Sequence, residues 1–331
     1  MTMNASTFWN KKKVTVAGGA GMIGSYLTEF LVRAGAYVTV ADNLQRGSDA
    51  NIKPLMKKID FIKKDLREFK NALSVCRKQE FVFNLAAQVT GIEYNRTHQA
   101  EMFHNNMLLQ QNVLMAASEV GVHRFVQVST ACVYPHDAVV PTPESEGKRG
   151  EPEPTNRGYG WAKRMGELLA EHVTRETGME CVIVRPFNAY GARDNFGEMT
   201  SHVIPALMKK ILEGNEPVEV WGSGNQKRVF VHAKDVAFGM LLLAEKAPPA
   251  DPVNVGHDEM VSIKVLYTVI TKVLGKSPQP FFNTQMPEGY PARAADITKL
   301  KKITGGFVPN TISLEDGIRE MADWYKKHCI K

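Results

Sequence analysis

Short apolar runs alternate with amphipathic stretches along the first half of the chain. The run 14–17 precedes a glycine-rich turn, and the stretch 23–34 places its apolar residues at helical spacing. Gly35 ends that stretch, and the next apolar run covers 37–41. Later runs of the same kind, each preceded by helical character, lie at 81–85, 124–128 and 181–184. Because strands separated by helices need crossover connections, the pattern predicts an α/β fold with a Rossmann-type, doubly wound parallel sheet.

The pattern changes after Gly191. It predicts a helix over 203–213, a short strand over 218–221, and then a strand at 229–231 whose following helix returns to the main sheet. Since 331 residues exceed the usual size of one core, we expect a Rossmann domain and a smaller mixed α/β domain. The predicted bounds are 10–190, with a return segment at 226–248, for the first domain, and 191–225 with 249–331 for the second.

The stretch between His136 and Arg157 is rich in Pro, Glu and Gly and shows no periodicity. Long loops inside compact domains are uncommon unless they serve a function. We therefore expect a long loop here, placed as a lid over a site.

Composition and charge exclude a mainly disordered or fibrous chain and argue against a membrane or nucleic-acid partner. Hydrophobic residues make up 44% and charged residues 23% of the chain, which is ordinary for a globular protein. The net charge of +6 favours anionic partners, but the positive residues are scattered, which favours a small diphosphate over nucleic acid. No apolar run approaches the ~20 residues of a membrane span. The first ten residues lack the layout of a signal peptide.

The four cysteines, Cys76, Cys132, Cys181 and Cys329, lie far apart and form no CxxC pair. This spacing argues against a metal site and against a disulfide framework, and it favours a reducing compartment. We therefore expect a cytoplasmic protein without a bound metal and without a membrane or nucleic-acid partner.

A glycine-rich turn follows the first strand and opens the first helix. It reads Gly18-Gly19-Ala20-Gly21-Met22-Ile23-Gly24, which fits G-x-x-G-x-x-G from Gly18 or G-x-G-x-x-G from Gly19. Glycines permit the tight turn and let the backbone approach a pyrophosphate at the helix N-terminus. The turn therefore predicts a dinucleotide site.

Asp42 ends the second strand, where its carboxylate can accept hydrogen bonds from the adenosine ribose and repel the extra phosphate of NADP. NAD is thus favoured over NADP, although Arg46 is close enough to weaken this preference. The predicted cofactor-binding residues come from the glycine turn and from the ends of the first strands. They are Gly18, Gly21, Met22, Ile23, Gly24, Asp42, Asn43, Asp65, Leu66, Ala86, Ala87 and Gln88.

Tyr159 and Lys163 lie four residues apart, on one face of a predicted helix. A neighbouring ammonium lowers the pKa of a phenol from its usual value of ~10 towards neutrality. Such a tyrosine can exchange a proton with substrate while a hydride moves to or from a nicotinamide. Because this spacing is also common on helix surfaces, the pair carries weight only beside the glycine turn.

The chain resembles the extended short-chain dehydrogenase/reductases, which include nucleotide-sugar epimerases and dehydratases. The resemblance rests on the glycine turn, Asp42, Asn106, Thr130 and the Tyr159/Lys163 pair, and extends from about Lys12 to the C-terminus. It implies that Thr130 bonds the substrate oxygen and that Asn106 and Lys163 lie in the cofactor site. It also implies a substrate-binding set of Gly91, Asn188, Val203, Lys210, Trp221, Arg228 and Arg293.

Two further residues resemble those of GDP-L-fucose synthases and GDP-mannose 3,5-epimerases. Ala131 and Cys132 stand where 4,6-dehydratases carry an Asp-Glu pair, and Cys132 matches the cysteine of the two GDP-sugar groups. His202, in Ser201-His202-Val203-Ile204-Pro205, matches the fucose-synthase histidine. The resemblance implies 3,5-epimerisation of a GDP-sugar through a 4-keto intermediate, with a thiol on one face and an imidazole on the other.

Alternatives stay open at this stage. Fucose synthases consume NADPH, whereas Asp42 favours NAD, and 3,5-epimerases carry a lysine where this chain offers His202. Cys132 is also compatible with a small core position, which would leave a C4 dehydrogenase or a 4-epimerase. A non-catalytic dinucleotide sensor or an RNA-binding relative would not need the Tyr159/Lys163 pair. The resemblance further implies a homodimer built on the helices that hold Asn106 and Tyr159.

Overall fold

The computed structural model describes residues 6–197 and 201–329. Within them, a seven-stranded sheet has the order β11-β6-β5-β4-β1-β2-β3, and each neighbouring pair is parallel. Its strands are β1 (Lys13–Ala17), β2 (Tyr37–Asp42), β3 (Ile59–Lys63), β4 (Phe81–Asn84), β5 (Arg124–Val128), β6 (Glu180–Pro186) and β11 (Val253–Val255). The predicted doubly wound sheet is confirmed. Its order reverses between β1 and β4, which is where ligands bind in open α/β sheets.

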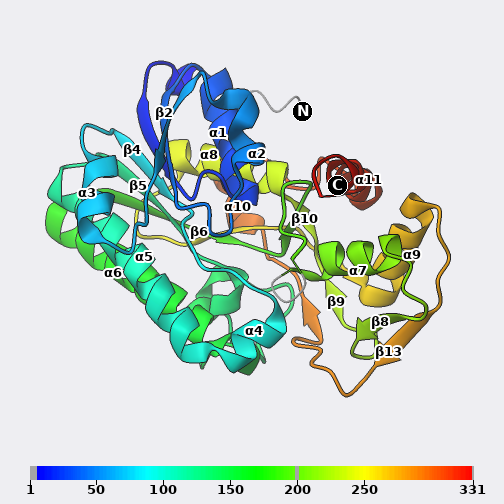
Figure 1. The fold of residues 1–331 in the computed structure, drawn as a ribbon. Helices are drawn as coiled ribbons and strands as arrows, with labels where there is room; N and C mark the ends of the chain where they lie inside the picture. The colour runs from blue at the N-terminus through cyan, green and yellow to red at the C-terminus, as the bar shows by residue number, and fades with distance from the viewer. Residues whose placement is uncertain (1–5, 198–200, 330–331) are drawn as a thin grey trace.

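Helices cover both faces of this sheet (Figure 1). One face carries α1 (Met22–Arg33), α8 (Ala233–Lys246) and α10 (Thr298–Thr304), and the other carries α3 (Phe69–Cys76), α5 (Gln99–Glu119) and α6 (Arg157–Thr177). Alternate residues of β1 point to opposite faces: Val14 and Val16 pack into the core under α1 and α8, whereas Ala17 packs into the core under α5 and α6. The sheet is therefore buried on both sides, as parallel sheets are.

A smaller part lies beside the carboxyl ends of the strands and has a core of its own (Figure 1). It contains α7 (Val203–Leu212), β8 (Val218–Trp221), α9 (Ile263–Leu274), β13 (Pro280–Asn283) and α11 (Leu314–His328). Its short strands pair as β8 with β13, and as β9 (Lys227–Arg228) with β12 (Val261–Ser262) and β14 (Ala292–Arg293). The strands β7 (Ala189–Tyr190) and β10 (Val231–His232) pair with each other.

The remaining described elements are short. They are α2 (Asp49–Ile52), α4 (Ile92–Thr97), and the 3₁₀ turns η1 (Thr7–Trp9), η2 (Lys53–Leu55), η3 (Ala131–Val133), η4 (Glu144–Lys148) and η5 (Pro154–Asn156).

The chain returns to the main sheet over a longer range than the sequence pattern indicates. The predicted return segment 226–248 holds α8, but β11 follows it and forms the edge strand beside β6. That strand has three residues and lies in the range 249–331, which the sequence assigns to the smaller domain. The division into a cofactor domain and a substrate domain stays a prediction.

The aperiodic stretch between His136 and Arg157 is held against α6. The guanidinium of Arg164 donates to the carbonyl oxygens of Val133, Arg149 and Gly150 at 2.7, 2.9 and 2.6 Å. The long loop is confirmed, and its role as a lid stays a prediction.

The described residues add two findings on membranes and metals. None of their helices is both long and apolar enough to cross a bilayer. Nor do any three or more of their His, Cys, Asp and Glu side chains cluster closely enough to hold a metal ion.

Candidate functional site

The glycine turn packs directly against the end of β4. Gly18 has a φ of +76°, and a Cβ there would lie 2.8 Å from the backbone nitrogen of Ala86. A Cβ on Gly24 would lie 2.3 Å from the carbonyl oxygen of Gly18. Side chains at either position would therefore displace backbone, which explains the glycines.

The residues around this turn fit a dinucleotide. Gly21 is the N-cap of α1 and gives no side-chain cap, which leaves the first-turn N–H groups of Met22 and Ile23 without that partner. Asp42 is tied to the turn, since its carboxylate accepts the N–H groups of Ala20 at 3.0 Å and Leu44 at 2.9 Å. A helix N-terminus suits a pyrophosphate, and a carboxylate at this strand end suits ribose hydroxyls. We propose that these residues hold NAD.

The other predicted cofactor residues lie at the neighbouring strand ends. Asp65 and the buried Leu66 follow β3, and Arg67 donates to the Asp65 carboxylate, which lowers its pKa. Asn106 of α5 is fully buried and holds the segment after β4. Its Oδ1 accepts the N–H of Gln88 and its Nδ2 donates to the Gln88 carbonyl, both at 3.0 Å. Asn43 follows the end of β2, and Ala86 and Ala87 follow the end of β4.

Tyr159 and Lys163 lie on the buried side of α6. The Lys163 ammonium donates to the carbonyl oxygen of Val128 at 2.8 Å, and its Nζ lies 5.8 Å from the centre of the Tyr159 ring. Burial lowers the pKa of Lys163 to about 8. The lysine is therefore anchored to the end of β5.

The prediction that Lys163 brings the pKa of Tyr159 towards neutrality is wrong. Tyr159 is only 8% exposed, and this burial raises its pKa. The neighbouring Cys132 adds to the rise. The Thr130 hydroxyl and the Arg46 guanidinium act in the opposite direction. Spacing along a helix gives the shared face but not the burial that dominates this pKa.

Thr130 and Cys132 meet Tyr159 where β5 ends. The Thr130 hydroxyl caps η3 by accepting the N–H of Cys132 at 3.2 Å. Gly160 lets α6 approach this turn, because a Cβ there would lie 2.5 Å from the carbonyl oxygen of Cys132. Cys132 is partly exposed, unlike the buried Cys76 and Cys181. Cys132 therefore does not occupy a core position.

Arg228 and Arg293 stand side by side on paired strands of the smaller part. They are direct partners in the register of β9 and β14. Burial and the neighbouring Arg293 lower the pKa of Arg228 to about 10. Nη1 of Arg293 donates to the Cys132 sulfur at 3.8 Å, while its buried Nη2 has no hydrogen-bond partner among the described residues. Arg293 is buried and Arg228 is half-buried, with the Arg228 guanidinium donating to the carbonyl oxygens of Lys227 and Glu288 at 2.8 and 2.9 Å. Two adjacent guanidinium groups suit an anion, and a diphosphate offers acceptors for both.

Sequence reasoning missed Tyr290, which supports this pair. Its ring lies beneath the Arg293 guanidinium, 3.5 Å from ring centre to Cζ, and its hydroxyl donates to the carbonyl oxygen of Tyr134 at 2.8 Å. An aromatic residue in a Pro- and Gly-containing loop gives no signal of its own. Its position three residues before Arg293 becomes informative only once Arg293 is placed.

His202 lies at the N-cap of α7 but makes no side-chain cap hydrogen bond. Its Nδ1 lies 3.0 Å from Oδ2 of Asp194. Burial lowers the pKa of Arg46, while Asp194 and Tyr159 act to raise it, which places Arg46 close to both.

The other predicted substrate residues are spread along the smaller part and its border. The Asn188 amide donates to the carbonyl oxygen of Val229 at 3.0 Å. Lys210 and Trp221 both reach the Glu219 carboxylate, at 3.4 and 3.2 Å. Gly91 is the N-cap of α4, and Val203 is the first residue of α7.

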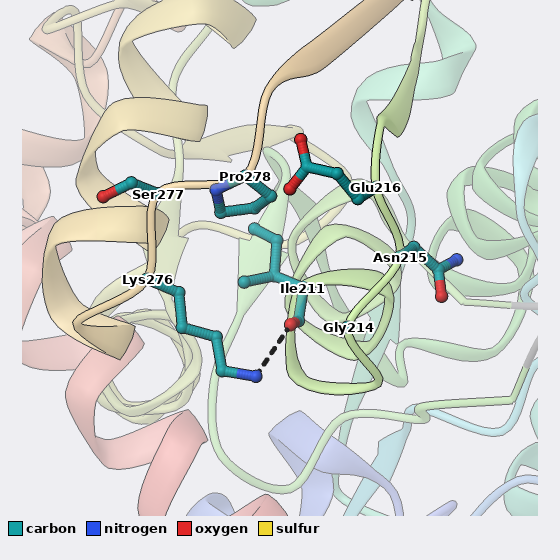
Figure 2. Close-up of a pocket in the computed structure, with 7 residues that line it drawn as sticks. All are labelled: Ile211, Gly214, Asn215, Glu216, Lys276, Ser277 and Pro278. Carbon is teal, nitrogen blue, oxygen red and sulfur yellow. Dashed lines mark hydrogen bonds between the residues drawn. The ribbon is translucent and has the colours of Figure 1, made fainter.

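The smaller part also has a surface hollow, near the end of α7 (Figure 2). It is lined by Ile211, Gly214, Asn215, Glu216, Lys276, Ser277 and Pro278. The Lys276 ammonium donates to the carbonyl oxygens of Ile211 and Leu212, both at 3.1 Å, and so caps the C-terminus of α7. None of the predicted site residues lines it.

A glycine turn and a buried Tyr-Lys pair on a doubly wound sheet define a class of nicotinamide-dependent enzymes. The comparisons with known proteins specify the family. The chain belongs to the NAD dependent epimerase/dehydratase family, whose model matches residues 14–256.

Similar proteins include GDP-sugar enzymes. The chain is 32% identical to GDP-L-fucose synthase of Escherichia coli strain K12, over 96% of this chain and 97% of that protein. It is 31% identical to GDP-mannose 3,5-epimerase 1 of Oryza sativa subsp. indica, over 98% of this chain and 85% of that protein.

A solved UDP-glucose 4-epimerase of Thermotoga maritima has a similar structure, with a TM-score of 0.86 and 27% identity over 96% of this chain and 99% of that chain. The UDP-glucuronic acid 4-epimerase of Bacillus cereus, solved with UDP-glucuronic acid and NAD, has a TM-score of 0.83 and 26% identity over 95% of this chain and 99% of that chain.

Proposed function

We propose that this enzyme epimerises a GDP-sugar at C3 and C5 through a 4-keto intermediate and retains its NAD. The observation that carries the proposal is the position of Cys132. Its partly exposed thiol lies beside Tyr159 and within 3.8 Å of the Arg293 guanidinium. A thiol between the redox tyrosine and an anion-binding arginine is well placed to act on a carbon of a bound sugar.

The substrate class follows from the paired arginines and from the similar proteins. Arg228 and Arg293 offer adjacent donors to a diphosphate, with Asn188, Lys210 and Trp221 along the same border. Relatives that cover nearly the whole chain are named for GDP-fucose and GDP-mannose. A GDP-hexose or GDP-heptose is therefore the proposed substrate.

Thr130, Tyr159 and Lys163 serve the oxidation and reduction at C4. As the phenolate, Tyr159 accepts the proton of the C4 hydroxyl, and as the phenol it later returns that proton; the Thr130 hydroxyl beside it acts against burial and lowers the pKa of Tyr159. The anchored Lys163 keeps a cationic amine next to the ring. NAD, when bound, supplies the hydride acceptor and donor.

Cys132 and His202 serve the epimerisation. The ketone at C4 makes the protons on C3 and C5 acidic, and one group removes such a proton while the other delivers one to the opposite face. A thiol and an imidazole can both exchange protons near pH 7. Breaking one C–H bond and forming another leaves the sugar isomeric and the cofactor unchanged in the net reaction.

The rival function is a 4-epimerase or C4 dehydrogenase that leaves Cys132 idle, as favoured by the solved 4-epimerases of similar structure. Cys132→Ser distinguishes the two. We expect the variant to lose C3 and C5 proton exchange by at least about 10²-fold, the usual effect of removing an acid/base group. Exchange is measured as deuterium uptake by GDP-mannose in D₂O. Cys329→Ser, at the exposed cysteine, is the matched control.

If Cys132→Ser keeps full exchange, the thiol is idle and the 3,5-epimerase proposal fails. If the wild-type enzyme interconverts C4 epimers without exchange at C3 and C5, the rival function holds.

We further propose a cytoplasmic homodimer that prefers NAD to NADP. Large apolar side chains lie exposed on the outer helices: Phe103 and Met115 on α5, and Leu168 on α6, are 39–44% exposed. Three such residues on two adjoining helices suit a self-complementary interface. Asp42, held at the glycine turn, disfavours a phosphate on the ribose.

A further inference from the structure

Asp194 is a buried carboxylate in direct contact with the proposed acid/base His202. Its Oδ2 lies 3.0 Å from Nδ1 of the imidazole, and its Oδ1 accepts the N–H of Asn195 at 2.7 Å. The side chain of Asp194 is 4% exposed, whereas that of His202 is 36% exposed. The carboxylate is therefore the fixed member of the pair, and the imidazole is the accessible one.

The segment that carries Asp194 is tied to the cofactor turn. The Arg193 guanidinium pairs with Glu29 of α1 at 2.9 Å and lies over the Tyr26 ring, 4.0 Å from its centre. The Asn51 amide donates to the carbonyl oxygens of Ala20, at 2.9 Å, and of Arg193, at 3.4 Å. These contacts hold Asp194 in place relative to the glycine turn.

A fixed carboxylate at Nδ1 decides what the other ring nitrogen can do. It accepts the Nδ1–H bond, which sets the tautomer and leaves Nε2 as the nitrogen that exchanges protons. When Nε2 gains a proton the ring becomes an imidazolium, and the carboxylate balances its charge. When Nε2 gives the proton to a carbon of the substrate, the neutral ring keeps its proton at Nδ1.

We propose that Asp194 is the positioning residue of His202, holding the imidazole with Nε2 towards the sugar. The proposal rests on the epimerase function described above. It separates the site into two units: Asp194 acts on C3/C5 proton exchange through His202, and the Tyr159 unit acts on C4 oxidation.

Asp194→Asn tests this separation, with Asp316→Asn as the matched control. Asp316 is likewise an aspartate paired with a basic side chain, that of Arg319, but it lies on the surface of α11 and is 66% exposed. In Asp194→Asn, deuterium uptake at C3 and C5 of GDP-mannose should fall about 10- to 100-fold, the usual effect of losing such a supporting carboxylate. The single-turnover rate at which oxidation of the sugar at C4 forms reduced nicotinamide should stay within about twofold of the wild-type rate, and so should the KM for GDP-mannose. In Asp316→Asn all three quantities should stay within about twofold of the wild-type values.

Unchanged exchange in Asp194→Asn would overturn the proposal, and so would an equal loss of exchange and C4 oxidation, since that pattern indicates a structural role. A wild-type enzyme that oxidises C4 without any exchange would instead overturn the epimerase function itself.

A second measurement needs no change at Asp194. Two-dimensional ¹H–¹⁵N spectra of the full chain labelled with ¹⁵N-histidine report the tautomer of each ring, and His202→Gln identifies the signals of His202. We expect the neutral ring to carry its proton on Nδ1. A proton on Nε2 in the neutral ring would contradict the proposal.

Discussion

The two sides of the candidate site are built in different ways. Thr130, Tyr159 and Lys163 belong to the central sheet and to the long helix α6, and Lys163 is bonded to the end of β5. Arg228 and Arg293 belong to the two-residue strands β9 and β14 of the smaller part. The redox side is thus fixed by the scaffold, whereas the substrate side depends on short segments that converge from distant parts of the chain.

This difference suggests that one side serves the chemical step and the other serves substrate recognition. Groups on rigid elements can keep the geometry that proton and hydride transfer require. Groups on short segments can be exchanged with little cost to the fold, which suits the choice of sugar and nucleotide. Variants on the two sides should therefore affect different kinetic constants.

The largest effect is expected on the redox side. Tyr159→Phe removes the hydroxyl that we propose exchanges the C4 proton, so kcat should fall about 10²- to 10⁴-fold with little change in KM. Tyr37→Phe, at a tyrosine 60% exposed, is the control. Steady-state kinetics with GDP-mannose give both constants. A Tyr159→Phe enzyme with wild-type kcat would remove the tyrosine from the mechanism.

An intermediate effect is expected on the substrate side. Arg293→Gln removes a charged donor, and a hydrogen bond to a charged group contributes about 1.5–3 kcal/mol. KM for GDP-mannose should therefore rise roughly 10- to 100-fold while kcat changes by a few-fold. Arg319→Gln, on the surface of α11, serves as the control. If Arg293→Gln lowered kcat alone, the contrast between the two sides would fail.

The fold could be predicted from sequence because its signals are local. The run 14–17 and the stretch 23–34 match β1 and α1 to within a residue or two. The edge strand β11 was not predicted, since it has three residues and follows a proline-containing segment. Tertiary pairing with β6, rather than local pattern, makes it a strand.

The candidate site was only partly predictable. Motifs place Tyr159 and Lys163 on one helical face, but burial, which decides the pKa of both, depends on the packing of α6 against η3 and β5. Nothing in the sequence brings Arg228 beside Arg293, because their proximity comes from the register of β9 and β14. The contact of His202 with Asp194 likewise appears only when the segment between β7 and α7 is folded.

The smallest effect is expected outside both sides, where the N-terminus of α8 meets α11. His232 caps α8, is almost fully buried, and its Nε2 lies 3.5 Å from the Glu320 carboxylate of α11. Burial lowers the pKa of His232 to about 4, whereas Glu320 acts to raise it. Between pH ~6.5 and about 4 the unfolded chain binds a proton that the folded chain does not, so the free energy of unfolding should decrease as the pH falls through this window.

His232→Asn keeps an N-cap acceptor and removes the titrating group. Urea unfolding at pH 7 and pH 5 should show a smaller loss of stability at pH 5 in this variant than in the wild type. An identical loss in both proteins would assign the acid sensitivity to other groups.

The central claim is a redox-neutral epimerisation, and one measurement tests it most directly. Purified enzyme is incubated with GDP-mannose in D₂O without added NADPH, and mass spectrometry follows the sugar and the nicotinamide together. We expect deuterium at C3 and at C5 while NAD stays with the protein unconsumed. A sugar without deuterium, or a reaction that proceeds only as NADPH is consumed, would contradict it.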